Sequence, residues 1–263
     1  GVPIEGLYSI MPDEGVSNVE LVRTAKAFLD ALTEEQRSRV MFPVDAPEWR
    51  QWSNMSAYHR NGLSFDEMTE GQRDQAFQLM RTALSAKGFK LSRDIMRLNE
   101  TIAELTAEHD RYSEWLYWLT VMGEPSKTEP WGWQVDGHHL VINYFVLGDQ
   151  VVMSPVFMGS EPVKAEGGKF KGTIICQAEQ DKGLSFINSL TKDQRDKAIV
   201  ATEKGPTNNV GESFSDNQVL DYIGIIGKEL EKKQKEQLLN LIMVYVGNMA
   251  DGHAKVKMTD VKK

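Results

Sequence analysis

Apolar residues recur every three to four positions in the first part of the chain, which is the period of an amphipathic helix. The first such stretch spans residues 18–32, the second runs from Thr69 to about Gly88, and the third begins after Ser92. The clearest apolar stripe belongs to the third stretch: Leu91, Ile95, Leu98, Ile102 and Leu105. We therefore predict a helical region over residues 18–110.

Three of the expected helix starts carry the same local sequence. Each has Thr at the cap position and Gln three residues later, so that each side chain can bond the backbone N–H of the other residue. The pairs are Thr33–Gln36, Thr69–Gln72 and Thr191–Gln194. Their uneven spacing indicates a capping motif used three times rather than an internal repeat.

After residue 114 the pattern becomes that of strands. Residues 115–122 are rich in strand-favouring side chains, and Gly148-Asp149 separates two apolar runs as the two-residue connection of a hairpin does. Another short run covers residues 173–177. We predict a central antiparallel sheet over residues 115–177, followed by helices over residues 181–263.

Helices on both sequence flanks of a central antiparallel sheet predict an α+β fold. At 263 residues the chain can bury one large core, and no linker divides it, so we predict a single domain over residues 1–263. The net charge of −8 disfavours a nucleic-acid partner, and the only basic run, Lys228–Lys235, is interleaved with glutamates. No apolar run is long enough to cross a bilayer, and the oligomeric state is not indicated.

Aromatic and imidazole side chains gather in residues 129–140. Trp131 and Trp133 share one face of a strand, where they either stack on a ligand ring or pack in the core. His138 and His139 follow them. Adjacent residues of an extended strand point to opposite faces, so the two histidines can share one metal ion only if a bend at Gly137 turns both the same way.

Three interpretations of the histidine pair stay open. The imidazoles are hydrogen-bonded packing groups, a metal ligand or acid–base group, or contacts to a polar ligand. A divalent metal ion, the only cofactor considered, needs further ligands, and none of the candidates stands at a diagnostic spacing. Those candidates are Glu129, Asp136, His59, Glu179 and Asp181.

Polar side chains also lie among aromatic residues in the irregular stretch 41–62. Asn54 and Arg60 either hold a carboxylate or phosphate of a small-molecule ligand or satisfy backbone groups of a loop. The sequence contains no nucleophile elbow, P-loop, dinucleotide fingerprint or His-Glu-x-x-His helix. Enzyme classes that depend on those motifs are therefore disfavoured.

Several of these motifs together resemble one protein family. They are Trp49-Arg50-Gln51-Trp52-Ser53-Asn54, Arg60-Asn61-Gly62, Gly123-Glu124-Pro125, Trp131-Gly132-Trp133, Gly137-His138-His139-Leu140 and Phe157-x-Gly159-x-Glu161-Pro162. Over most of its length the chain is similar to the largely bacterial family catalogued as domain of unknown function 3500. The resemblance implies no activity. It does imply export, with a signal peptide ahead of a start like Gly1, although a trimmed tag would leave the same start.

The resemblance also bears on the end of the sequence. The family pattern continues past a segment like Tyr245-Val246-Gly247-Asn248 into a further sheet region with more histidines, whereas this sequence stops at Lys263 after a helix without a closing cap. We therefore expect a shortened chain. The region beyond it would supply imidazoles opposite His138 or His139.

Two functions from different classes follow. The first is an exported metal-assisted enzyme, hydrolytic or oxidative, with His138 or His139 as metal ligand or general base. In it the surrounding pocket is shaped by Asn54, Arg60, Trp131 and Trp133. The second is a non-catalytic exported binding or surface-assembly module, in which the same residues only pack and hydrogen-bond the end of the sheet.

Overall fold

The computed structural model describes residues 15–203, 211–215 and 219–263. Its centre is a six-stranded mixed sheet, and its flanks are helices, which confirms the α+β fold. The strands are β1 (Met41–Phe42), β2 (Leu63–Ser64), β3 (Tyr117–Met122), β4 (Trp131–Gly137), β5 (Leu140–Leu147) and β6 (Gln150–Met158).

The sheet runs in the order β1-β3-β4-β5-β6, and β2 also pairs with β3. The strands from β3 to β6 are antiparallel, as predicted, and Gly148 turns between β5 and β6 with a φ of 57°. Only β1 is parallel to its neighbour β3. The prediction of a strand over residues 173–177 is wrong, because Ile174 makes one isolated bridge with Lys164 and a helix begins at Gln177.

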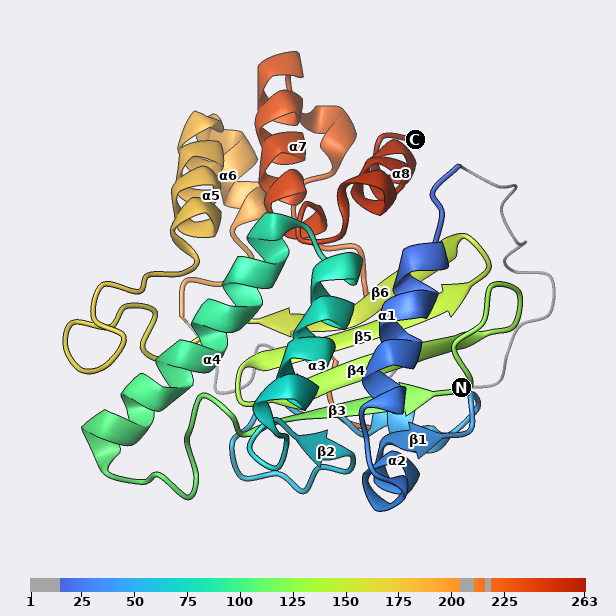
Figure 1. The fold of residues 1–263 in the computed structure, drawn as a ribbon. Helices are drawn as coiled ribbons and strands as arrows, with labels where there is room; N and C mark the ends of the chain where they lie inside the picture. The colour runs from blue at the N-terminus through green and yellow to red at the C-terminus, as the bar shows by residue number, and fades with distance from the viewer. Residues whose placement is uncertain (1–14, 204–210, 216–218) are drawn as a thin grey trace.

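Helices α1 (Val19–Asp30), α3 (Glu70–Ala83) and α4 (Ala86–Thr106) lie across one face of the sheet (Figure 1). A short helix, α2 (Glu34–Val40), leads into β1. Side chains of β4 alternate between the two faces. Trp131, Trp133 and Val135 point toward the helices and lie in the hydrophobic core.

The capping motif predicted at Thr33, Thr69 and Thr191 is confirmed, because each Thr and its Gln bond each other's backbone. The predicted boundary between the second and third helices is wrong. Gly88 and Ser92 both lie inside α4, which begins after Ser85, and the Gly88 N–H donates to Ser85 Oγ at 3.0 Å. Gly88 serves close packing instead of helix termination: a Cβ there would lie 2.1 Å from the carbonyl oxygen of Asn248.

The remaining helices gather at one end of the sheet (Figure 1). They are α5 (Gln177–Ser189), α6 (Lys192–Ala198), the 3₁₀ turn η2 (Gly227–Glu229), α7 (Lys232–Val246) and α8 (Asp251–Val261). The connection from α7 to α8 is tied to the α3–α4 junction, where Ser85 Oγ donates to the Gly247 carbonyl at 2.6 Å and the Ala250 N–H donates to the Ala83 carbonyl at 3.0 Å. Among the described residues, no helix has the length and apolar character needed to span a membrane.

The second face of the sheet carries buried polar side chains and is covered by the irregular stretch 43–62, which includes the 3₁₀ turn η1 (Pro47–Arg50). Gln134 and Asp136 of β4 point to this face, as does Asn143 of β5. All three side chains are buried. Gln134 Nε2 donates to Asn143 Oδ1 at 2.6 Å, so part of this polar layer is satisfied within the sheet itself.

Candidate functional site

The histidine pair forms the two-residue connection between β4 and β5, next to the paired residues Gly137 and Leu140. Of the two arrangements that the sequence left open, the extended one with the imidazoles on opposite faces is therefore excluded, and the one with a bend at Gly137 is present. The chain turns directly after Gly137, and the rings of His138 and His139 stack with their centroids 4.0 Å apart and their planes at 28°. The turn brings the two imidazoles to one place.

His139 has an unusual backbone and an unusual ring environment. Its φ of 60° is left-handed, a conformation that costs a side-chain-bearing residue roughly 1–2 kcal/mol. Its backbone N–H donates to the Asn54 carbonyl at 3.0 Å, and its own carbonyl accepts from the Gly159 N–H at 2.9 Å. Both ring nitrogens are buried and have no hydrogen-bond partner in the described part of the chain. Unpaired buried polar atoms cost free energy, and in native proteins they call for an explanation.

The environment of His138 fixes its tautomer. The ring Nδ1 lies 2.9 Å from Asn99 Oδ1, and Asn99 Nδ2 donates to the Ser113 carbonyl at 2.8 Å. Because the amide oxygen of Asn99 can only accept, the imidazole must donate from Nδ1. The lone pair of His138 therefore sits on Nε2.

Both imidazoles are held in the neutral form. Burial lowers the pKa of His138 to about 3, and the charges of Arg60 and Arg111 act in the same direction. Burial also lowers the pKa of His139, against an opposing effect of Glu161. The pair thus offers uncharged nitrogen atoms throughout the neutral pH range.

Aromatic rings bracket the pair. The ring of Tyr112 lies 5.3 Å from that of His138, and the ring of Phe157 lies 6.0 Å from that of His139. From the sheet side, the hydroxyl of the fully buried Tyr117 donates to the His138 carbonyl at 2.9 Å. The turn is therefore held at its backbone as well as at its rings.

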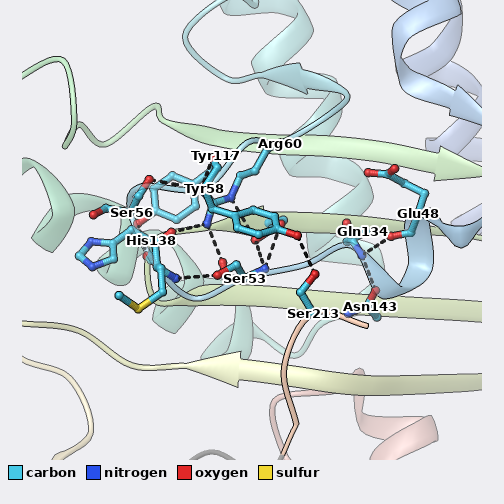
Figure 2. A network of polar contacts seen from close by, with 12 residues as sticks. Glu48, Ser53, Ser56, Tyr58, Arg60, Tyr117, Gln134, His138, Asn143 and Ser213 are labelled. Carbon is cyan, nitrogen blue, oxygen red and sulfur yellow. Dashed lines mark hydrogen bonds and ion pairs between the residues drawn. The ribbon is translucent and has the colours of Figure 1, made fainter. Parts of the chain in front are cut away.

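Arg60 lies beside His138 (Figure 2), on the face of the sheet that carries Asp136. Its Nε is 3.1 Å from Asp136 Oδ1, an ion pair without hydrogen-bond direction, and the two side chains are only 2% and 5% exposed. Its Nη2 donates to the carbonyls of Ser53 and Met55, both at 2.6 Å, and its Nη1 donates to the Tyr58 carbonyl at 3.3 Å. Arg60 thus satisfies backbone groups of the loop, which is one of the two roles left open by the sequence.

Asp136 anchors the same loop to β4. Its carboxylate oxygens accept from the Ser53 N–H, each at 3.3 Å. Burial raises the pKa of Asp136 to about 7, although the Arg60 guanidinium opposes the shift. Asn54 follows Ser53, is half-buried, and contributes its backbone carbonyl to His139. The Arg60–Asp136 pair therefore positions the loop segment that holds the histidine turn.

The two tryptophans lie elsewhere. Both are fully buried in the core on the helix-covered face. Trp133 stacks on Tyr144 with centroids 5.3 Å apart, and Trp131 Nε1 donates to the Ser126 carbonyl at 2.9 Å. This burial favours the packing role over ligand stacking, because neither ring presents a face to solvent.

The sequence considerations missed Asn99 and Tyr112. Asn99 did leave a signal: it lies four residues after Ile95 and three before Ile102, so it interrupts the apolar stripe of α4 with an amide. A buried amide at such a position needs a polar partner. Nothing in the spacing indicates that the partner is His138, which is 39 residues away in sequence.

The described residues contain no group of three His, Cys, Asp or Glu side chains arranged to hold a metal ion. None of the five candidate partners named from the sequence therefore completes a three-residue group with the imidazole pair. At this turn, an ion would find the two neutral imidazoles of His138 and His139 as ligands.

Comparisons with known proteins agree with the motifs. The family model described as "Protein of unknown function (DUF3500)" matches residues 14–263. Searches of curated proteins and of solved structures found no match. The histidine turn, the Arg60 loop and the tryptophans of β4 all lie inside the matched region, and the chain belongs to the DUF3500 family.

Proposed function

We propose that the protein is a metal-assisted enzyme with its centre at the His138–His139 turn. One observation carries the proposal: two stacked, neutral imidazoles in which both ring nitrogens of His139 and Nε2 of His138 have no hydrogen-bond partner among the described residues. Neutral imidazole is a common ligand of transition metals, and a ligating histidine usually donates its other ring N–H to a nearby oxygen. Asn99 accepts such a bond from His138.

A metal ligand fits His138 better than a general base does. An efficient general base has a pKa near the working pH, whereas burial lowers the pKa of His138 to about 3. Metal binding instead requires a deprotonated nitrogen, and a low pKa removes competition from protons. The low pKa therefore weakens the general-base role and leaves the lone pair of Nε2 unprotonated at neutral pH.

The spacing of the rings is compatible with one shared ion. Two nitrogen ligands of a tetrahedral ion lie about 3.3 Å apart, because each bond is about 2.0 Å long. The ring centroids are 4.0 Å apart, and a shared ion would require one nitrogen of each ring to approach to about 3.3 Å. A bound ion with only two protein ligands has open positions for water or substrate, and it would supply Lewis acidity for a hydrolytic or an oxidative reaction.

A non-catalytic binding or surface-assembly module is the second candidate. It is favoured by the positions of Arg60, Trp131 and Trp133, since the first binds loop backbone and the other two pack in the core. For either candidate we keep the exported location that the motifs imply. Fractionation of cells that express the natural gene tests the location, and a cytoplasmic protein would contradict it.

The direct test of function is the metal content of purified, untagged protein by elemental mass spectrometry. After incubation with zinc, copper, iron or manganese and removal of free ion, we expect close to one ion per chain, and we expect its loss in His138→Ala and in His139→Ala. His59 and His109 are exposed, so His59→Ala and His109→Ala are the controls and should keep the ion. An ion-free wild-type protein would contradict the proposal, as would equal loss in the controls.

A further inference from the structure

Arginine and aromatic side chains form two matching stripes on α3 and α4. Along α3, Arg73, Phe77 and Arg81 are spaced four residues apart, which places them on one helical face. Along α4, Phe89, Arg93 and Arg97 have the same spacing. The two helices lie side by side on the outside of the molecule (Figure 1).

The stripes interlock through cation–π contacts. The Cζ of Arg81 lies 4.4 Å from the ring centroid of Phe89, and that of Arg93 lies 4.3 Å from the centroid of Phe77. Trp115 continues the series, with the Cζ of Arg93 at 4.9 Å and that of Arg73 at 4.8 Å from its ring. We call Arg73, Arg93 and Arg81 the arginine ladder. Each guanidinium lies over a ring, which orders the group and still allows N–H donors at its edge to bond an anion.

The ladder has few acceptors of its own, and that of Arg73 is the Phe65 carbonyl, to which Nη1 donates at 2.9 Å. Arg93 is 13% exposed, and its partners are Met96 Sδ at 3.2 Å and the Glu114 carboxylate at 3.9 Å. That carboxylate also binds Lys169 through its other oxygen. Arg81 is exposed and has no hydrogen bond or ion pair within the described residues. A guanidinium has five donors, so the ladder has unused hydrogen-bonding capacity.

The like charges also act on one another. The pKa of Arg93 is lowered to about 10, mainly by burial; Glu114 and Asp94 oppose the shift, and the charges of Arg97 and Arg81 contribute to it. The positive potential of this surface is thus only partly neutralised, in a chain whose net charge is −8. An anionic partner would relieve the repulsion.

The spacing of the ladder indicates the form of the partner. Four residues of α-helix rise about 6 Å, so Arg73, Phe77 and Arg81 lie on successive turns of α3. Arg93 of α4 lies over the ring of Phe77, the middle of these three residues. Alternate residues of an extended chain are about 6.6 Å apart and point the same way. We propose that the arginine ladder binds an extended acidic segment of a partner protein, with carboxylates at alternate positions facing successive guanidinium groups.

Nucleic acid fits the ladder less well. Single strands bind through bases stacked on free aromatic faces and through a broad positive groove. Here guanidinium groups cover faces of the rings, and the overall charge repels a long polyanion. Carboxylates require only the free N–H edges.

Fluorescence anisotropy with a labelled peptide of alternating glutamate and serine tests the proposal. We expect saturable binding that weakens as salt is raised, and no binding of the peptide with glutamine in place of glutamate. Arg81→Gln and Arg73→Gln should each weaken binding at least about fivefold. Lys26→Gln, an exposed cation on α1, is the charge-matched control and should bind as the wild type does.

Because Arg93 is largely buried, Arg93→Lys is used in place of a truncation, with the melting temperature measured alongside. It should weaken binding in a protein that melts as the wild type does, since a lysine does not reproduce the planar stacked fork. Equal binding of the glutamine peptide, equal loss in Lys26→Gln, or tighter binding of a single-stranded oligonucleotide than of the acidic peptide would overturn the proposal.

Discussion

Replacement of Arg60 by Met is expected to lower the free energy of unfolding by about 3–5 kcal/mol, because a buried carboxylate loses its counter-charge. Asp136 is 5% exposed, and Arg60 is its ion-pair partner. The variant also loses the donors to the carbonyls of Ser53 and Met55. Urea denaturation measures the change.

A surface pair provides the control for this prediction. Arg39 and Glu67 are 2.7 Å apart, but their side chains are 44% and 40% exposed. Arg39→Met should therefore cost no more than about 1 kcal/mol. The double variant Arg60→Met/Asp136→Leu should recover part of the loss, since it removes the unpaired charge. Equal costs for Arg60→Met and Arg39→Met would contradict a structural role for the buried pair.

The Arg60–Asp136 pair also makes the free energy of unfolding depend on pH. Burial raises the pKa of Asp136 to about 7, so the folded protein holds this proton more tightly than the unfolded chain does. Its contribution to stability is present below the unfolded pKa of about 4 and is lost as the pH rises through 7. We therefore expect Arg60→Met to lose more free energy of unfolding, relative to the wild type, at pH 8 than at pH 5. The melting temperature of Asp136→Asn should lack this component of the pH dependence.

Replacement of His139 by Gly is expected to abolish metal binding while raising the free energy of unfolding by about 1 kcal/mol. Glycine adopts the φ of 60° without strain, and the change also removes two unpaired buried nitrogens. Opposite effects on stability and function are typical of a residue retained for function in an unfavourable conformation.

The packing alternative predicts the opposite change in stability. If the His139 ring mainly supports the turn by stacking between His138 and Phe157, its removal should cost about 2 kcal/mol or more. His139→Ala separates the two contributions, because it removes the ring and keeps the strained backbone. Chemical denaturation of both variants, with metal content measured on the same samples, distinguishes the two accounts.

Local features of the fold could be predicted from the sequence. The Thr–Gln caps and the Gly148-Asp149 turn depend on residues within three positions of one another, and the structure confirms them. The start of α4 also has a local cap, Ser85, but the sequence prediction took Gly88 for a helix end and Ser92 for the next helix start. Gly88 lies in the first turn of α4, and the reason for a glycine there is the close approach of the distant Asn248 backbone, which local pattern does not reveal.

In the candidate site, too, the residues could be identified from local sequence, but their arrangement could not. The sequence singled out His138 and His139, but their arrangement depends on a turn that forms only when β4 pairs with β5. The tautomer of His138 depends on Asn99, and the backbone of His139 on the Asn54 carbonyl. Each of these contacts joins segments far apart in the chain, and for that reason local pattern does not reveal them.

The central claim is that the turn presents neutral imidazole nitrogens to an ion, and nitrogen-15 NMR of histidine-labelled protein tests it directly. We predict that His138 carries its proton on Nδ1, stays neutral down to about pH 4, and shifts at Nε2, together with a nitrogen of His139, when one equivalent of zinc is added. Titration of His138 near its ordinary pKa would contradict the account. So would zinc shifts confined to the exposed His59 and His109.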